Sequence, residues 1–199
     1  DGRIIRYFDG KDDYEVMSVD DMHLFGNHNY ENVMAAIAMT IEAGVPLNII
    51  INVIKDFMGV EHRIEYVRDK NGVRYYNDSK GTNPDSSIKA LEAMSRPTIL
   101  IAGGYDKHSE FDEFIEAFDN KVKLMVLLGQ TADKIEETAV RHGFTNIIKT
   151  DSLEKAVKIC AENAVSGDVV LLSPACASWG MFKNYEERGK LFKEYVNSL

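Results

Sequence analysis

Residues 98–104 read Thr-Ile-Leu-Ile-Ala-Gly-Gly, a continuous apolar run that ends on two glycines. Apolar residues at every position, instead of at alternate positions, are typical of a strand that is buried on both faces. Similar runs occur at Leu124–Leu128 and Val169–Leu172, and a shorter one occurs at Asn146–Ile148. Helical patterns separate these strands, so we expect an α/β fold with a doubly wound, mostly parallel sheet.

Five amphipathic segments are predicted to be the helices that cover this sheet, because each places apolar residues three or four positions apart. They are Asp85–Met94, Glu110–Phe118, Ala132–His142, Leu153–Ala164 and Tyr185–Val196. A hairpin of Ile64–Arg68 and Val73–Tyr76 precedes them, joined by an Asn-Gly turn.

The first sixty residues follow a different pattern. Strands at Arg3–Tyr7 and Tyr14–Val19 flank an Asp-Gly turn, and helices follow at Asn27–Ala43 and between Pro46 and Phe57. These elements lack a sheet of their own to pack on. We therefore expect residues 1–59 to be the end of one domain and residues 60–199 to be a second domain.

Composition excludes several classes of protein. The chain has 199 residues, 45% hydrophobic and 28% charged, which is ordinary for a globular protein and excludes disorder and collagen. Its net charge of -9 gives no basic surface, so we expect no nucleic acid and no membrane as partner. No apolar run approaches the roughly 18 residues of a membrane helix, and we expect a cytoplasmic location. Two cysteines without zinc-site spacing predict buried thiols and no bound metal.

Ligands of open α/β sheets bind at the carboxyl ends of the strands, so the loops that follow the predicted strands are the candidate sites. Asn77–Pro84 is polar at almost every position and places Lys80 near a helix N-terminus, where an anion could bind. A helix-capping turn explains the same residue types, and both interpretations stay open here.

The other loops carry weaker signals. Gly103–His108 has two glycines but lacks the Gly-x-Gly-x-x-Gly pattern of nicotinamide sites, and His108 alone reads as a surface histidine. Ser173–Gly180 has small residues that suit either an anion-binding loop or a plain connection. Leu128–Thr131 is interpreted as a simple turn with Thr131 as the N-cap and no chemistry.

Two upstream motifs carry polar side chains with possible binding roles. Asn29 and Asn32 lie three residues apart and share one helix face, which favours polar recognition or an N-terminal cap. Arg63, at the predicted domain boundary, has the planar guanidinium that suits a phosphate, although a surface ion pair explains it equally well.

Taken in order, these motifs resemble those of the Mur ligases. The matching segments are Gly-Asn-His-Asn-x-x-Asn at 26–32, Gly-Val-Glu-His-Arg at 59–63, Asn-Asp-Ser-Lys-Gly-Thr-Asn at 77–83, Gly-Gly-Tyr-Asp-Lys at 103–107, Leu-Ser-Pro-Ala-Cys-Ala-Ser at 172–178 and Lys-Asn-Tyr-Glu-Glu-Arg-Gly at 183–189. The loop at 77–83 resembles the branch of the family that adds D-glutamate.

The resemblance implies a three-domain enzyme. Residues 1–59 would be the truncated end of a central ATPase domain, and residues 60–199 a C-terminal Rossmann-like domain that binds the amino acid. The sequence has no Gly-x-x-x-x-Gly-Lys-[Ser/Thr] phosphate loop. The phosphate loop, the family's carbamylated lysine and most magnesium ligands are thus expected outside this chain, which alone should be inactive.

The resemblance also implies a reaction in peptidoglycan precursor synthesis. ATP phosphorylates the carboxylate of UDP-N-acetylmuramoyl-L-alanine, and the amine of D-glutamate attacks the acyl phosphate to give an amide, ADP and phosphate. ATP and Mg are the expected cofactors, the two small molecules are the expected partners, and a monomer is the expected state.

Site residues carry over from the family by motif. Those implied for the nucleotide are Asn29, Asn32, Arg63 near the phosphates and Asp78 on the ribose, with Arg63 and Lys80 implied as catalytic. Those implied for D-glutamate are Thr82, Lys107, Ser178 and Tyr185. Tyr185 departs from the family pattern, because relatives often have Phe there.

Two alternatives remain at this point. One is another amide ligase of the superfamily, of the Mur type or of the type that extends folate with glutamate; the loop at 77–83 argues against it. The other is a non-catalytic nucleotide-binding module, which the lack of a phosphate loop favours.

Overall fold

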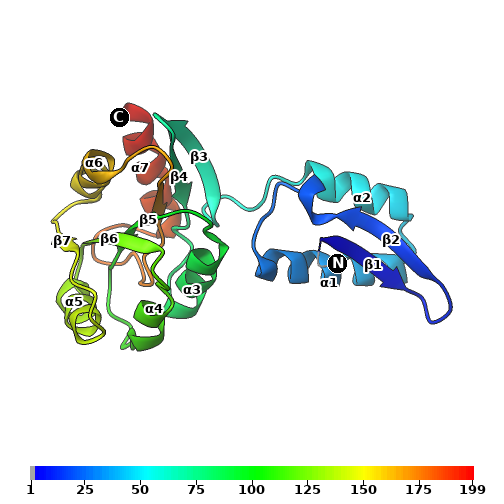
Figure 1. The fold of residues 1–199 in the computed structure, drawn as a ribbon, viewed down its shortest axis with the longest axis horizontal. Coiled ribbons are helices and arrows are strands. Elements are labelled where there is room, and N and C mark those ends of the chain that lie inside the picture. Colours follow the sequence, from blue (N-terminus) through cyan, green and yellow to red (C-terminus); the bar gives the residue numbers. More distant parts are fainter. Residues whose placement is uncertain (1–2) are drawn as a thin grey trace. The chain divides into compact units, whose positions relative to one another are not determined.

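A computed structural model describes residues 3–199 of the chain. The chain divides into two compact units, with the first ending at Gly59 and the second beginning at Val60 (Figure 1). Within residues 3–199, no helix combines the length and the apolar character that crossing a membrane requires.

The first unit is a hairpin with two helices. Strands β1 (Ile4–Phe8) and β2 (Asp13–Ser18) pair antiparallel, and α1 (Asn27–Glu42) and α2 (Leu47–Asp56) follow a short 3-10 turn. One apolar core joins the hairpin to both helices and includes Ile5, Met17, Val33, Ile37 and Ile50.

The second unit is built on a six-stranded sheet with the order β3-β4-β8-β5-β6-β7. Its strands are β3 (Glu65–Lys70), β4 (Val73–Asn77), β5 (Thr98–Ala102), β6 (Val122–Leu127), β7 (Ile147–Lys149) and β8 (Val169–Leu172). Only the edge strand β3 runs antiparallel to its neighbour among the described strands of this sheet. The predicted mostly parallel sheet is confirmed.

Five helices pack against this sheet: α3 (Pro84–Ala93), α4 (Asp112–Glu116), α5 (Ala132–Arg141), α6 (Leu153–Asn163) and α7 (Tyr185–Ser198). Side chains of α6 and α7, among them Val157 and Phe192, share a buried core with Tyr75, Ile101 and Val170 of the strands. Helices α3, α4 and α5 lie on the other side of the sheet (Figure 1).

All predicted boundaries of the helices and strands lie within two residues of the observed ones, and α4 differs most, by two residues at each end. The predicted helix over Glu110–Phe118 is shorter in the structure, because Phe111 provides no side-chain cap at its start. At its other end, Asp119 and Asn120 both take positive φ angles, which end a right-handed helix.

Candidate functional site

Three loops meet at the carboxyl edge of the sheet in the second unit. The strand register places the end of β8, at Leu172, beside both Asn77 of β4 and Ile101 of β5. The loops that follow these three strands are therefore neighbours, although they are far apart in the sequence. The first loop follows β4 after Asn77, the second follows β5 after Ala102, and the third follows β8 after Leu172. Two backbone bonds tie the second to the third: Gly103 N–H donates to Pro174 O at 2.8 Å, and Tyr105 N–H donates to Ala177 O at 2.9 Å.

Ser173 connects the first loop to the third. Its hydroxyl donates to Asp78 Oδ2 at 2.6 Å and lies 2.8 Å from the hydroxyl of Ser87 on α3. The Ser87 hydroxyl also accepts the backbone N–H of Ala175 at 2.9 Å. The side chains of Ser173, Asp78 and Ser87 are all buried, so water does not compete for these hydrogen bonds and they fix the positions of the loops.

Asp78 is a buried carboxylate, only 3% exposed. Besides Ser173, it accepts the backbone N–H of Ile64 at 3.3 Å. Burial raises the pKa of Asp78 to about 7, although the bond from Ser173 and the positive charge of Arg63 act in the opposite direction. Near neutral pH, the buried carboxyl group of Asp78 is therefore present in both its protonated and its ionised form.

Arg188 of α7 forms hydrogen bonds to both the first and the third loop. Its guanidinium donates to Ser79 Oγ at 2.9 Å, to Ser79 O at 2.8 Å and to Cys176 O at 3.2 Å. Burial lowers the pKa of Arg188 to about 10, which still leaves it charged at neutral pH. A buried guanidinium satisfied by backbone oxygens acts as a rigid clamp, because its planar donors fix the direction of each bond.

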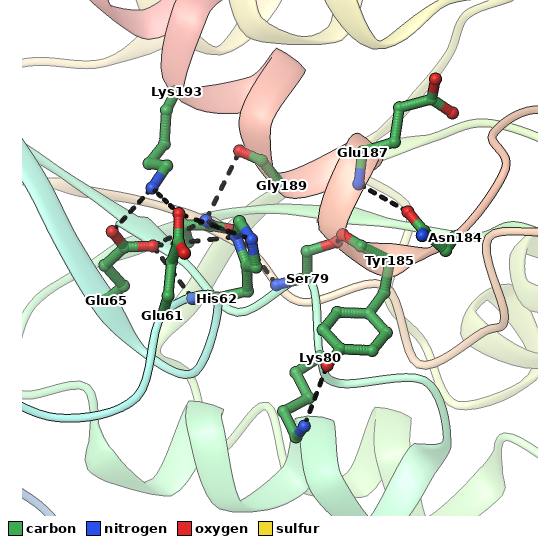
Figure 2. A network of polar contacts seen from close by, with 11 residues as sticks. Glu61, His62, Glu65, Ser79, Lys80, Asn184, Tyr185, Glu187, Gly189 and Lys193 are labelled. Atoms are coloured by element: carbon green, nitrogen blue, oxygen red, sulfur yellow. Dashed lines mark hydrogen bonds and ion pairs between the residues drawn. The ribbon is translucent and has the colours of Figure 1, made fainter.

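A second cluster surrounds His62 (Figure 2). Asn77 Nδ2 donates to His62 Nδ1 at 2.9 Å and to Glu65 Oε2 at 3.0 Å, and Lys193 bridges Glu65 and Glu61. Burial lowers the pKa of His62 more than the nearby carboxylates raise it. The ring is thus neutral at pH 7, with Nδ1 as an acceptor, and it is part of the scaffold of the loops.

The backbone beside this cluster is strained. His62 has a φ of 67° and Ile64 a φ of 46°, a region that a β-branched side chain rarely occupies. Lys80 N–H donates to His62 O at 3.0 Å, and the bond from Ile64 to Asp78 holds the other residue. These bonds maintain the strain and present the exposed side chain of Arg63 between the two residues.

The side chains of Lys80 and Tyr185 lie together, as Figure 2 shows. The ammonium of Lys80 donates to the Tyr185 hydroxyl at 3.1 Å and lies 4.8 Å from the centre of its ring. Both side chains are half-buried, and Lys80 has no acidic partner among the described residues. Ser79 Oγ donates to Tyr185 O at 2.8 Å, which fixes the start of α7 against the first loop.

Comparison with known proteins identifies the family to which the chain belongs. Residues 62–176, which contain the first two loops and the start of the third, match the family described as Mur ligase, glutamate ligase domain. The chain belongs to this family of Mur ligases.

Individual relatives agree with the family assignment. A UDP-N-acetylmuramoylalanine–D-glutamate ligase of Lachnospira eligens is 64% identical over 199 residues, which are 100% of this chain and 44% of that protein. A ligase of the same name from Lachnoclostridium phytofermentans is 57% identical over 195 residues, 98% of this chain and 43% of that protein. The chain thus spans less than half the length of these Mur ligases.

Solved structures support the fold. The MurF ligase from Thermotoga maritima in complex with ADP has a TM-score of 0.61 at 21% identity, and the match covers 98% of this chain and 44% of that one. The predicted Rossmann-like α/β architecture is therefore that of a Mur ligase.

The structure places the residues that the Mur motifs singled out in two groups. Arg63, Asp78, Lys80, Thr82, Lys107, Ser178 and Tyr185 all belong to the second unit. Lys107 is exposed and forms no salt bridge with a described residue, Ser178 is buried next to the bridge between Tyr105 and Ala177, and Thr82 N–H donates to Lys80 O at 2.8 Å.

The remaining pair, Asn29 and Asn32, lies on α1 of the first unit. Asn29 Nδ2 donates to Phe25 O at 2.8 Å, and Asn32 is exposed. Gly26 precedes α1 with no side-chain cap, so neither asparagine is the N-cap that one interpretation of the motif allowed.

Thr131 occupies the predicted N-cap position of α5, but its side chain has a different role. Thr131 provides no side-chain cap to α5; instead its hydroxyl accepts the N–H of Gly104 at 3.0 Å and lies 3.2 Å from Cys176 Sγ. It joins the second loop to the third. The sequence did not reveal this role of Thr131, since a threonine before a helix most often acts as a cap. The roles of Ser173, Ser87 and Arg188 were also missed.

Metal ligands are not grouped in this part of the protein. Within residues 3–199 no three side chains of His, Cys, Asp or Glu come together in a way that could hold an ion. The side-chain donors of the described residues therefore do not make up a magnesium site.

Proposed function

We propose that this chain is the amino-acid-binding part of a UDP-N-acetylmuramoylalanine–D-glutamate ligase. One observation carries the proposal: Lys80 and Lys107, in two adjacent loops at one sheet edge, have no acidic partner among the described residues. Two unpaired ammonium groups suit a small molecule with two carboxylates, and D-glutamate is such a molecule.

We propose the following contacts for D-glutamate. Lys107 meets one carboxylate and Lys80 the other, which requires Lys80 to exchange its bond to the Tyr185 hydroxyl. Thr82 and Ser178 supply hydroxyl donors, and the Tyr185 ring forms a wall. Held in this way, the amine of D-glutamate lies at a fixed position. Its freedom to diffuse is lost on binding, so the attack on an acyl phosphate does not carry that entropic cost.

For ATP we propose a smaller role of this chain. Arg63, exposed between two strained residues, is positioned to approach phosphates, and Asn29 and Asn32 would contact the nucleotide. Asp78 can reach a ribose only if it exchanges the bond to Ser173 or to Ile64. The phosphate loop and the magnesium ligands are proposed to belong to the part of the ligase that this chain does not span.

ATP and a UDP-linked precursor are charged molecules of the cell interior, so we propose that the ligase acts in the cytoplasm. The chain alone is proposed to be inactive and monomeric. Gel filtration tests the second point, and an assay of phosphate release tests the first.

A chimera tests the whole proposal. This chain replaces the matching segment of the Lachnospira eligens ligase, and phosphate release is measured with UDP-N-acetylmuramoyl-L-alanine, ATP and one amino acid at a time. Turnover should occur with D-glutamate and be lost with L-glutamate, L-alanine or L-lysine. Turnover with one of these instead of D-glutamate would assign the chain to another amide ligase. A chimera that folds, binds ATP and turns over nothing favours the non-catalytic module.

A further inference from the structure

A cavity of about 360 Å³ lies in the second unit, at the end of β4 opposite to the three loops. Lys70, Asn71 and Val73 of the β3–β4 hairpin form one side, and Ala161 and Ala164 at the end of α6 form another. Volumes of roughly 300–1,000 Å³ are typical of small-molecule sites. Nothing in the proposed ligase reaction uses this cavity.

The rim of the cavity is held in place by the backbone. Gly167 N–H donates to Gly72 O at 3.0 Å, which ties the hairpin turn to the segment that enters β8. A Cβ atom at Gly72 would lie 2.2 Å from Ser166 Oγ, so the two segments are in close contact. The cavity therefore exists before any ligand binds, which lowers the cost of binding.

Tyr75 brings an unpartnered polar group to the wall of the cavity. Its side chain is only 2% exposed and belongs to the core that includes Val157 and Cys160 of α6. The hydroxyl is its only polar side-chain atom, and it forms no hydrogen bond with any residue in the described part of the chain. Since no fully enclosed side-chain oxygen among these residues lacks a partner, this hydroxyl is accessible from the cavity. A ligand oxygen in the cavity can therefore accept a hydrogen bond from this hydroxyl.

The charges around the cavity favour one negative group. Lys70 forms no salt bridge within residues 3–199, whereas Lys158 is occupied by Glu154 at 2.6 Å. Glu162 also lines the cavity and repels a second anionic group. The available partner charge is therefore a single ammonium, beside an apolar wall of Val73, Ala161 and Ala164.

We propose that this cavity binds a small amphipathic monoanion, a carboxylic acid with an apolar ring. The carboxylate contacts Lys70 and the Tyr75 hydroxyl, and the ring packs between the start of β4 and the end of α6. Because β4 also ends at Asn77, beside the three loops, such a ligand binds one end of the strand that supports the candidate site at its other end. The proposal does not depend on the identity of the ligase substrate.

Nuclear magnetic resonance of the 199-residue chain tests the proposal with two probes, 3-phenylpropanoate and its neutral amide. The acid should shift the backbone amide signals of Asn71, Val73 and Ala161 with a dissociation constant that is roughly millimolar, and the amide should bind at least about three-fold more weakly. The signals of Thr82 and Lys107 should stay unchanged. No shift at the cavity with either probe overturns the proposal, and equal binding of both overturns the choice of an anion.

Matched variants locate the site. Lys70→Ala and Tyr75→Phe should each weaken the acid by about three-fold or more, since each removes one bond to the carboxylate. Lys155→Ala removes a lysine of α6 that does not line the cavity and should leave binding unchanged. Ala161→Phe should abolish binding by filling the space, with circular dichroism as the check of folding. If Lys155→Ala weakens binding as much as Lys70→Ala, the ion is held only by the general charge of the surface and the proposal is wrong.

Discussion

Arg188 donates two hydrogen bonds to one residue, Ser79: Nε bonds to the hydroxyl at 2.9 Å and Nη2 bonds to the carbonyl at 2.8 Å. Ser79 then passes the constraint on, because its hydroxyl donates to Tyr185 O. The first loop, the start of α7 and the third loop are therefore positioned by a single guanidinium. Lys80, Ser178 and Tyr185, which are proposed to contact D-glutamate, belong to these three segments.

Arg188→Lys should lower the free energy of unfolding by about 2–4 kcal/mol, because one ammonium cannot replace three planar donors and leaves buried carbonyls without partners. Urea denaturation measures the change. Arg141→Lys serves as the control, since Arg141 is exposed and its ion pair with Asp112 lies at the surface; it should cost under about 0.5 kcal/mol. Equal losses in both variants would show that the Arg188 clamp adds no stability.

Asp78→Asn should stabilise the protein more at pH 8 than at pH 4. Burial raises the pKa of Asp78 from 3.8 to about 7, so the folded state keeps a proton that the unfolded state loses between these pH values. Stability contributed by Asp78 therefore falls as pH rises from about 4 to about 7, by up to about 4 kcal/mol. Asparagine is neutral throughout, and its amide can still bond to Ser173.

Thermal or urea unfolding at both pH values checks this difference. Asp85→Asn changes an exposed carboxylate in the first turn of α3 and should alter stability by under about 1 kcal/mol at either pH. A difference between Asp78→Asn and the unchanged chain that is the same at pH 4 and pH 8 contradicts the raised pKa.

Lys107→Ala in the chimera should raise the KM for D-glutamate or lower kcat, with a loss of roughly 1.5–3 kcal/mol in transition-state binding, and leave the KM for ATP nearly unchanged. Steady-state kinetics with each substrate varied in turn separates the two effects. Lys121→Ala, at the amino end of β6, is the matched control and should change neither constant. A raised KM for ATP with an unchanged KM for D-glutamate would show that this loop contacts ATP and not D-glutamate.

Tyr185→Phe should cost under about 1 kcal/mol in D-glutamate binding, because the ring stays and only the hydroxyl that holds Lys80 is removed. Free of this bond, Lys80 no longer has to exchange it for a carboxylate. Kinetics of the chimera measure the change, and Tyr195→Phe on the same helix is the control. A large rise in the KM for D-glutamate would show that the hydroxyl itself contacts the substrate.

Limited proteolysis should leave residues 60–199 intact longer than residues 1–58, since the second unit has its own six-stranded sheet with a buried core packed against it. Mass spectrometry of the fragments gives the order of cleavage. Earlier loss of the second unit would contradict the boundary near Gly59.

Continuous apolar runs made the sheet predictable. Thr98–Ala102 and Val169–Leu172 agree at both ends, because each is buried on both faces and is followed at once by loop residues. The strand at β7 was placed one residue early, since a three-residue strand at a sheet edge carries little pattern. The order of the strands, with β8 between β4 and β5, depends on long-range pairing that local periodicity does not encode.

The site was predictable where the chemistry follows a motif and unpredictable where it depends on contact. Lys80 and Lys107 stand out in the sequence as cations in polar or glycine-rich loops. Arg188 does not, because an arginine in the first turns of an amphipathic helix is ordinary, and only its burial reveals the clamp. The ribose contact of Asp78 stays a prediction, and the bonds of its carboxylate to Ser173 and Ile64 could not be foreseen from the motif.

The position of β8 has a consequence for synthesis on the ribosome. Strands β4 and β5 are complete once residue 102 has been made, but both pair with β8, which is not made until residue 172. The nascent chain must therefore wait with two unpaired apolar strand edges for about seventy residues, several seconds at roughly 5–20 residues per second. Unpaired strand edges are templates for pairing with other chains, and the sheet edge that carries the three loops is completed only when β8 has been made.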